Sequence, residues 1–197
     1  MLVRHSEAGH EGVRYVGKTD APLTHAGRRQ AERLEKSIHR QAPSRALSSP
    51  LRRCLETAEI LLKNINLVLE CDPELREVDF GRWEGLTFRD IAARDPRLVE
   101  QWALGEMDFC FPEGESLVDF WDRVGHVAQR LREMPCECVL AVTHAGVIRY
   151  LLCHFLGFDA QSHLRFDIRP AALTRLHFQD DNAVLTGLNE HCPQEES

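Results

Sequence analysis

The sequence predicts a layered α/β fold, because short apolar segments alternate along it with longer segments of helical periodicity. The runs Leu2–Val3 and 139–142 are short, continuous and apolar, as is typical of buried parallel strands. Between them, residues 51–62 place their leucines and an alanine on one helical face. The chain has 197 residues, of which 43% are hydrophobic, so it is long and apolar enough for one domain with a core.

The remaining elements follow the same alternation. Expected strands are apolar runs bounded by charge or turn residues, over 2–3, 45–48, 67–69, 139–142, 173–178 and 183–188. Expected helices carry an N-terminal capping residue or an apolar stripe, over about 24–39, 49–62, 86–104, 116–131 and 145–156. Thr24 is the expected N-cap of the first helix, and Ser49-Pro50 is expected to cap and start the second. The last two strands flank Asp180–Asn182 and predict a hairpin, and 73–85 is expected to be an extended loop.

Composition and charge exclude several classes of protein. Lys and Arg number 24 and Asp and Glu number 31, which gives a net charge of −7 and argues against binding to nucleic acid or to an anionic membrane. No apolar run approaches the ~20 residues of a membrane span, and the N-terminus does not resemble a signal peptide. The seven cysteines are scattered, so we expect reduced thiols and a cytoplasmic protein. Cys136 and Cys138 admit a metal or redox interpretation, although incidental thiols explain the spacing as well.

Basic residues and histidines gather where the expected strands end. Arg4 and His5 follow the first strand, and His144 follows the strand over 139–142. Arg53 lies near the start of the second helix, where a cation is unfavourable unless an anion is close by. Ligands of α/β sheets bind beyond the carboxyl ends of the strands, so these groups predict a pocket for a dianion if their strands are neighbours. Taken singly, each histidine could instead be a core residue and each arginine a surface charge.

Six segments, in order, resemble the histidine phosphatase superfamily, with its phosphoglycerate-mutase-like fold, over residues 2–190. They are Leu-Val-Arg-His at 2–5, Arg-Tyr-Val-Gly-Lys-Thr-Asp-Ala-Pro-Leu-Thr at 14–24, Ser-Pro-Leu-Arg-Arg at 49–53, Asp-Phe-Gly-Arg-Trp-Glu-Gly at 79–85, Pro-Glu-Gly-Glu-Ser at 112–116 and Thr-His-Ala-Gly at 143–146. The resemblance implies a three-layer α/β/α sandwich with a mostly parallel central sheet. It also implies a single domain over 1–190 with a small cap of helix and loop around 80–116, which leaves 191–197 as a frayed tail.

The same resemblance implies a role for each matching residue. His5 would be the nucleophile that forms a phosphohistidine. Arg4, Arg53 and His144 would hold the phosphoryl oxygens. Further phosphate contacts would come from Ser6 and Gly17 and from the N–H groups of Ala145 and Gly146. Glu77 would protonate the leaving alkoxide and then deprotonate the attacking water. No metal and no cofactor are expected.

The resemblance implies a phosphomonoesterase acting on a small phosphorylated metabolite. The segments at 14–24 and 79–85 are most similar to the alpha-ribazole phosphatase-like branch, whose substrate is alpha-ribazole 5'-phosphate in cobalamin biosynthesis. Two alternatives stay open: a phosphoglycerate-mutase-type phosphoryl transfer, and a phosphate-binding protein of weakened activity. The second is motivated by Ser6 in place of the usual Gly, by Ala8 in place of Thr or Ser, and by the segment 9–12, which lacks the usual Asn. A homodimer is compatible with the sequence.

Overall fold

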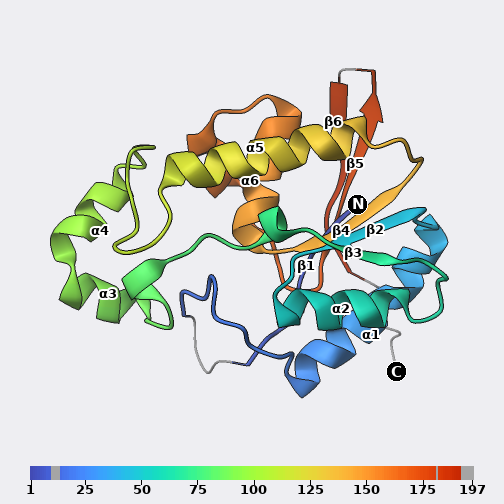
Figure 1. The fold of residues 1–197 in the computed structure, drawn as a ribbon, viewed down its shortest axis with the longest axis horizontal. Coiled ribbons are helices and arrows are strands. Elements are labelled where there is room, and N and C mark those ends of the chain that lie inside the picture. Colours follow the sequence, from blue (N-terminus) through green and yellow to red (C-terminus); the bar gives the residue numbers. More distant parts are fainter. Residues whose placement is uncertain (10–13, 181, 192–197) are drawn as a thin grey trace.

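A computed structural model describes residues 1–9, 14–180 and 182–191, and its centre is a six-stranded sheet of order β3-β2-β4-β1-β5-β6 (Figure 1). The strands, in chain order, are β1 (Leu2–Arg4), β2 (Arg45–Ser48), β3 (Leu69–Cys71), β4 (Val139–Thr143), β5 (Leu173–Gln179) and β6 (Asn182–Glu190). The first four are mutually parallel, and β5 and β6 add an antiparallel hairpin beside β1. The sheet is therefore mostly parallel, as the sequence predicted.

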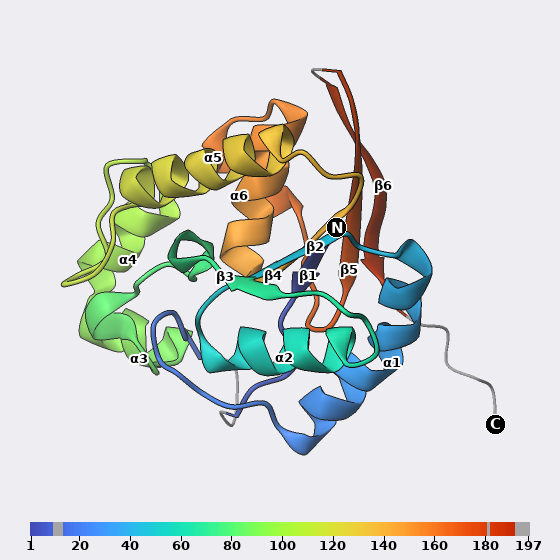
Figure 2. The same cartoon turned by 45° about the vertical axis from the view of Figure 1, so that its right-hand side comes forward.

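Helices cover both faces of this sheet, which gives the predicted α/β/α sandwich. They are α1 (His25–Gln41), α2 (Arg52–Leu62), α3 (Phe88–Arg94), α4 (Pro96–Ala103), α5 (Leu117–Glu133) and α6 (Ala145–Leu156), with short 3₁₀ turns η1 (Pro73–Leu75), η2 (Gly81–Trp83) and η3 (Ala160–Arg165). Figures 1 and 2 show α1 and α2 against one face and α5 and α6 against the other. Helices α3 and α4 lie beyond the sheet, in the region where a cap was expected.

The alternation of side chains along the strands explains the two layers of core. Val3 packs with α1 and α2, whereas its neighbour Leu2 packs on the opposite side with α5 and α6. Val142 and Ala141 of β4 divide between the two faces in the same way. Successive side chains of a strand point to opposite faces, so a strand that is covered on both sides must be apolar throughout.

Three expected elements differ from the structure. The helix expected over 86–104 is two helices, because Asp95 lies outside helical geometry before Pro96, which begins α4. Its carboxylate accepts hydrogen bonds from Trp83 Nε1 (2.8 Å) and Arg82 (3.1 Å), which anchor the break. The strand expected at 67–69 pairs with β2 over Leu69–Cys71 instead, and the loop over 73–85 contains two 3₁₀ turns.

A side chain caps the N-terminus of α1, α3 and α5, whereas α2, α4 and α6 begin without such a bond. Thr24 accepts a hydrogen bond from Gly27 N at the start of α1, as predicted, and Ser116 caps α5 in the same manner. Ser49 does not cap α2: the N-cap is Leu51, without a side-chain bond. Within the described part of the chain, no helix is long and apolar enough to cross a membrane. The division into a domain over 1–190 and a cap over 80–116 stays a prediction, and the tail lies outside the described residues apart from His191.

Candidate active site

The site forms where three parallel strands end side by side. In the register of the sheet, Arg4 of β1 lies opposite Thr143 of β4, and Ser48 of β2 lies opposite Val142. The ladder continues by one bond, since His5 N–H donates to Thr143 O at 2.9 Å. His5 and His144 therefore leave neighbouring strands at the same level, and their ring centroids are 5.1 Å apart at an interplanar angle of 63°. Two histidines far apart in the sequence meet because β4 pairs directly with β1, which is the condition under which the sequence predicted a shared pocket.

The ring of His5 is fixed by its own backbone. Nδ1 lies 2.8 Å from the carbonyl oxygen of Ser6, and a carbonyl only accepts, so Nδ1 carries a proton. The pKa of His5 is lowered from 6.5 to about 3, mainly by burial and then by the charges of Arg53 and Arg4, whereas the Ser6 carbonyl acts in the opposite direction. The imidazole is therefore neutral near pH 7, and its lone pair is on Nε2.

His144 is fully buried, and its partners were not foreseen from the sequence. Nε2 lies 2.8 Å from Ser49 Oγ and 3.4 Å from Cys54 Sγ. Burial lowers the pKa of His144 well below 6.5, with further lowering by His5 and then by the charges of Arg53, Arg4 and Arg123. The local sequence at Ser49 predicts a helix cap, but the N-cap of α2 is Leu51. Only the position of β2 beside β4 shows that its hydroxyl binds a histidine.

Arg53 and Arg4 are anchored by backbone carbonyls, which orient a guanidinium group without cancelling its charge. Arg53 is 1% exposed and donates to the carbonyl oxygens of Thr19 and Gly17, both at 2.7 Å. Arg4 donates through Nη1 to Ile168 O at 2.7 Å. Burial lowers the pKa of Arg4, and the nearby Glu77 carboxylate opposes that effect. Both cations thus act on His5, as its lowered pKa shows.

Three buried polar atoms of this region have no hydrogen-bond partner among the described residues: Arg4 Nε, Arg53 Nε and Ser6 Oγ. Ser6 is fully buried, and its backbone N–H donates to Thr57 Oγ1 at 3.1 Å, which holds the residue in place. An unpaired buried donor costs about 1–3 kcal/mol, so such atoms concentrate where a ligand completes their bonding. Three of them next to His5 are what an anion site requires.

The backbone groups of Gly17 are bonded to other residues of the protein, whereas the sequence predicts a phosphate contact here. Its N–H donates to Glu84 Oε1 at 2.9 Å, so this group is not available to a phosphate, and its carbonyl holds Arg53. The same carboxylate also accepts from Lys18 N (2.9 Å) and from the hydroxyl of Thr19 (2.7 Å). A Cβ on Gly17 would lie 2.0 Å from Val78 O, so only glycine fits this close approach. Gly17 therefore positions an arginine instead of contacting phosphate itself.

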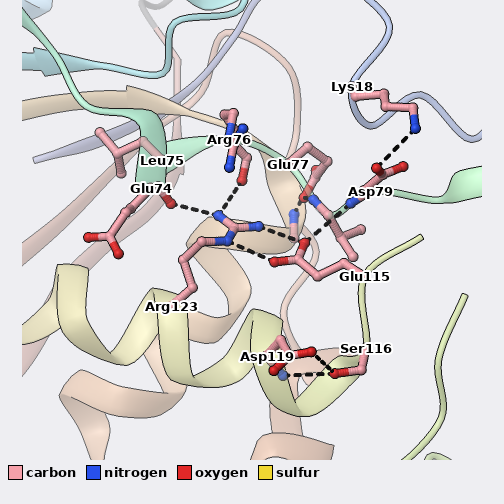
Figure 3. A network of polar contacts seen from close by, with 12 residues as sticks. Lys18, Glu74, Leu75, Arg76, Glu77, Asp79, Glu115, Ser116, Asp119 and Arg123 are labelled. Carbon is pink, nitrogen blue, oxygen red and sulfur yellow. Dashed lines mark hydrogen bonds and ion pairs between the residues drawn. The ribbon is translucent and has the colours of Figure 1, made fainter. Parts of the chain in front are cut away.

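Glu77 reaches the site at the N-terminus of α6. Its Oε2 accepts a hydrogen bond from Gly146 N at 3.1 Å, and its Oε1 accepts one from Val78 N at 3.1 Å (Figure 3 labels Glu77). A Cβ on Gly146 would lie 2.3 Å from Oε1, so a larger residue would displace the carboxylate. The Gly146 N–H, expected as a phosphate contact, is therefore bonded to Glu77 instead.

The chain resembles known proteins along almost its whole length. Residues 1–191 match the family model described as histidine phosphatase superfamily (branch 1). The chain belongs to the histidine phosphatase superfamily. Phosphoserine phosphatase 1 of Hydrogenobacter thermophilus is 28% identical over 98% of this chain and 92% of that protein. A protein of Yersinia pestis named probable phosphoglycerate mutase is 29% identical over 94% of this chain and 87% of its own length.

Solved structures agree with this assignment to the histidine phosphatases. The alpha-ribazole phosphatase from Shigella flexneri superimposes with a TM-score of 0.89 at 29% identity, over 96% of this chain and 95% of that one. A mycobacterial glucosyl-3-phosphoglycerate phosphatase gives 0.80 at 28% identity, over 95% of this chain and 96% of that one. The fold is therefore the phosphoglycerate-mutase-like fold that the sequence predicted.

Of the departures from the family pattern, the structure describes two. The hydroxyl of Ser6 has no hydrogen-bond partner among the described residues. Ala8 forms an isolated antiparallel bridge with Leu23. The segment 9–12 lies outside the described residues, apart from Gly9. Within the described ranges, no group of three or more His, Cys, Asp or Glu is arranged to hold a metal ion.

Proposed function

We propose that the protein hydrolyses a small phosphate monoester through a phosphohistidine at His5. The observation that carries this proposal is the bond from His5 Nδ1 to Ser6 O, on a ring that the charges of Arg53 and Arg4 also keep neutral. It leaves the lone pair on Nε2 and keeps the ring uncharged, and these are the two properties that a nucleophilic imidazole needs. A histidine held only for structure would have no need of unpaired donors beside it.

In this proposal, the two arginines, Ser6 and His144 bind the phosphoryl oxygens. The transition state spreads negative charge over three equatorial oxygens, so prearranged donors in a site with little water stabilise it most. Arg4 Nε, Arg53 Nε and Ser6 Oγ are buried donors without a partner among the described residues, so they are available to these oxygens. An N–H of Ala145, the first residue of α6, is expected to add a further contact.

Glu77 transfers the protons. In the first step the bond between His5 Nε2 and phosphorus forms, the ester P–O bond breaks, and the Glu77 carboxyl gives its proton to the departing oxygen. In the second step water attacks phosphorus, Glu77 takes a proton from it, and the N–P bond breaks to release inorganic phosphate. The first step leaves His5 phosphorylated and Glu77 ionised, and the second step returns both residues to their starting state. Since Arg4 and Arg53 neutralise the phosphoryl charge, we expect no requirement for a metal ion.

The substrate within this class is a narrower proposal. Likeness to the alpha-ribazole phosphatase of Shigella flexneri supports alpha-ribazole 5'-phosphate. The phosphoserine phosphatase and the named phosphoglycerate mutase are equally similar in sequence, at 28% and 29% identity, so a panel of esters is needed to choose.

The test measures inorganic phosphate released from alpha-ribazole 5'-phosphate, phosphoserine and 3-phosphoglycerate in the presence of a chelator. We expect release from at least one ester by the wild type and none by His5→Ala, with an acid-labile phosphoryl label on the wild type alone. Turnover that survives His5→Ala would overturn the mechanism. An isomeric ester in place of free phosphate would favour the mutase, and vanadate binding without any turnover would favour a binding protein.

A further inference from the structure

The segment that carries Glu77 has little regular structure of its own. Residues 76–79 follow the short turn η1, and no strand pairs with them. Arg76 is extended, with φ −65° and ψ 150°. A carboxyl on such a segment would sample many positions unless other elements held its backbone, and proton transfer requires placement within hydrogen-bond reach.

Three successive carbonyl groups before Glu77 are each bound by a side chain from another element. Arg123 of α5 donates through Nη1 to Glu74 O at 2.7 Å and to Arg76 O at 2.8 Å. Thr143, at the end of β4, donates to Leu75 O at 2.6 Å. The segment is therefore held by one side chain from α5 and by another from the end of β4. Figure 3 shows Arg123 reaching the segment from α5.

Glu115 extends this support to the other side of Glu77. Its carboxylate binds Nε and Nη2 of Arg123, both at 2.8 Å, and also accepts from Asp79 N at 3.3 Å. The backbone N–H of Glu115 donates to Asp79 O at 2.9 Å. The ion pair therefore binds the chain both before and after Glu77 (Figure 3).

This ion pair is well shielded from water, since the side chains of Arg123 and Glu115 are 12% and 18% exposed. Arg123 uses four of its five N–H donors here, in a planar arrangement that a lysine cannot reproduce. Neither residue is hydrogen-bonded to the arginines, Ser6 or the histidines of the phosphate site. The charge of Arg123 does help to lower the pKa of His144, after the larger effects of burial, His5, Arg53 and Arg4. The direct bonds of the pair therefore hold the segment that carries the acid, and none of them reaches the phosphate site.

We propose that Arg123 and Glu115 are positioning residues for the Glu77 carboxyl. The inference rests on the proposed function, because it assigns Glu77 the proton transfer to the leaving group. Loss of the pair would let the carboxyl shift from Gly146 N, and a misplacement of about 1 Å costs ~10²-fold in rate. The rate with esters whose leaving group is stable without a proton would change little, because such esters do not need the Glu77 proton.

The experiment compares kcat/KM for two esters, an alkyl phosphate that the substrate panel identifies and p-nitrophenyl phosphate. The ratio kcat/KM reports steps up to phosphoryl transfer, so slow hydrolysis of the phosphohistidine does not enter. For Arg123→Lys and Glu115→Gln we expect a fall of ~10²-fold with the alkyl ester and a much smaller fall with the aryl ester. Glu77→Gln should show the same selective loss, and adding it to Arg123→Lys should lower the rate no further.

The matched control is Arg130→Met. Arg130 lies on the same helix and pairs with the side chains of Asp72 and Glu74, yet it binds no carbonyl of the segment. We expect this variant to have the wild-type kcat/KM for both esters. If Arg123→Lys does not fold, Glu115→Gln and Thr143→Val carry the test, and the selective loss is expected from each.

Equal losses with the two esters, together with weaker vanadate binding, would show a general structural role and overturn the inference. So would wild-type kinetics in every variant. Failure of the proposed function has a different signature, because it would appear as activity in His5→Ala or as no phosphate release by the wild type.

Discussion

The burial of His5 near the charges of Arg53 and Arg4 makes the stability of the protein depend on pH in a way that can be measured. The pKa of His5 is lowered from 6.5 to about 3 in the folded chain, mainly by burial and then by Arg53 and Arg4. In the unfolded chain the imidazole has its ordinary pKa. As the pH falls below 6.5, the unfolded state therefore binds a proton that the folded state does not bind, and stability is lost toward pH 3.

The size of the effect follows from the two pKa values. Each proton bound only by the unfolded state changes the free energy of unfolding by about 1.4 kcal/mol per pH unit. Between about pH 6.5 and about pH 4.5, His5 alone would lower the free energy of unfolding by up to ~2 kcal/mol. The side chain is partly exposed, so this figure is an upper limit.

The assay is urea unfolding of the wild type and of His5→Gln at a series of pH values, in buffers without phosphate or sulfate. The difference between the two proteins isolates the histidine, because the carboxylates contribute to both. We expect the wild type to lose up to ~2 kcal/mol more than the variant over this range. His177→Gln removes an exposed imidazole and serves as the matched control. Parallel curves for wild type and His5→Gln would refute the placement of a neutral imidazole in this pocket.

Three further outcomes are expected. Gly146→Ala would place a Cβ 2.3 Å from Glu77 Oε1, so kcat/KM for alkyl esters should fall by ~10- to 100-fold, and unchanged kinetics would contradict this contact. Glu84→Gln weakens the bonds to three groups of one loop and should lower the free energy of unfolding by about 1–3 kcal/mol in urea titrations. Burial raises the pKa of the Cys54 thiol and closes it to solvent, so mass spectrometry after iodoacetamide treatment of the native protein should find exposed Cys71 modified and Cys54 intact.

Local patterns were enough to predict most of the helices and strands. The cap at Thr24 and the apolar stripe after Ser116 are properties of neighbouring residues, so α1 and α5 could be located without knowledge of the fold. The break at Asp95 could not be located in this way, although Pro96 was visible. The carboxylate of Asp95 is bound by Trp83 and Arg82, and those bonds depend on how the chain folds back.

The candidate site, like the fold, could be predicted from the sequence only in part. Ordered motifs identified the two arginines, the two histidines and Glu77 as candidates, because phosphoryl transfer needs cations, a nucleophile and an acid. The motifs did not distinguish a residue that faces an anion from one that holds its neighbour. Gly17 and the Gly146 N–H were expected at the phosphate, and the structure binds them to Glu84 and Glu77.

The sequence by itself determined the layered α/β fold, the family and the candidate residues of the site, because periodicity, capping and motif order are properties of the chain alone. The tertiary structure alone decided that β4 lies between β1 and β2, and this order sets His144 beside His5 and Ser49. It also decided that Arg123 and Glu115 bracket Glu77. These pairs join residues tens of positions apart, so they exist only once the sheet is assembled and its two layers of helices are packed against it.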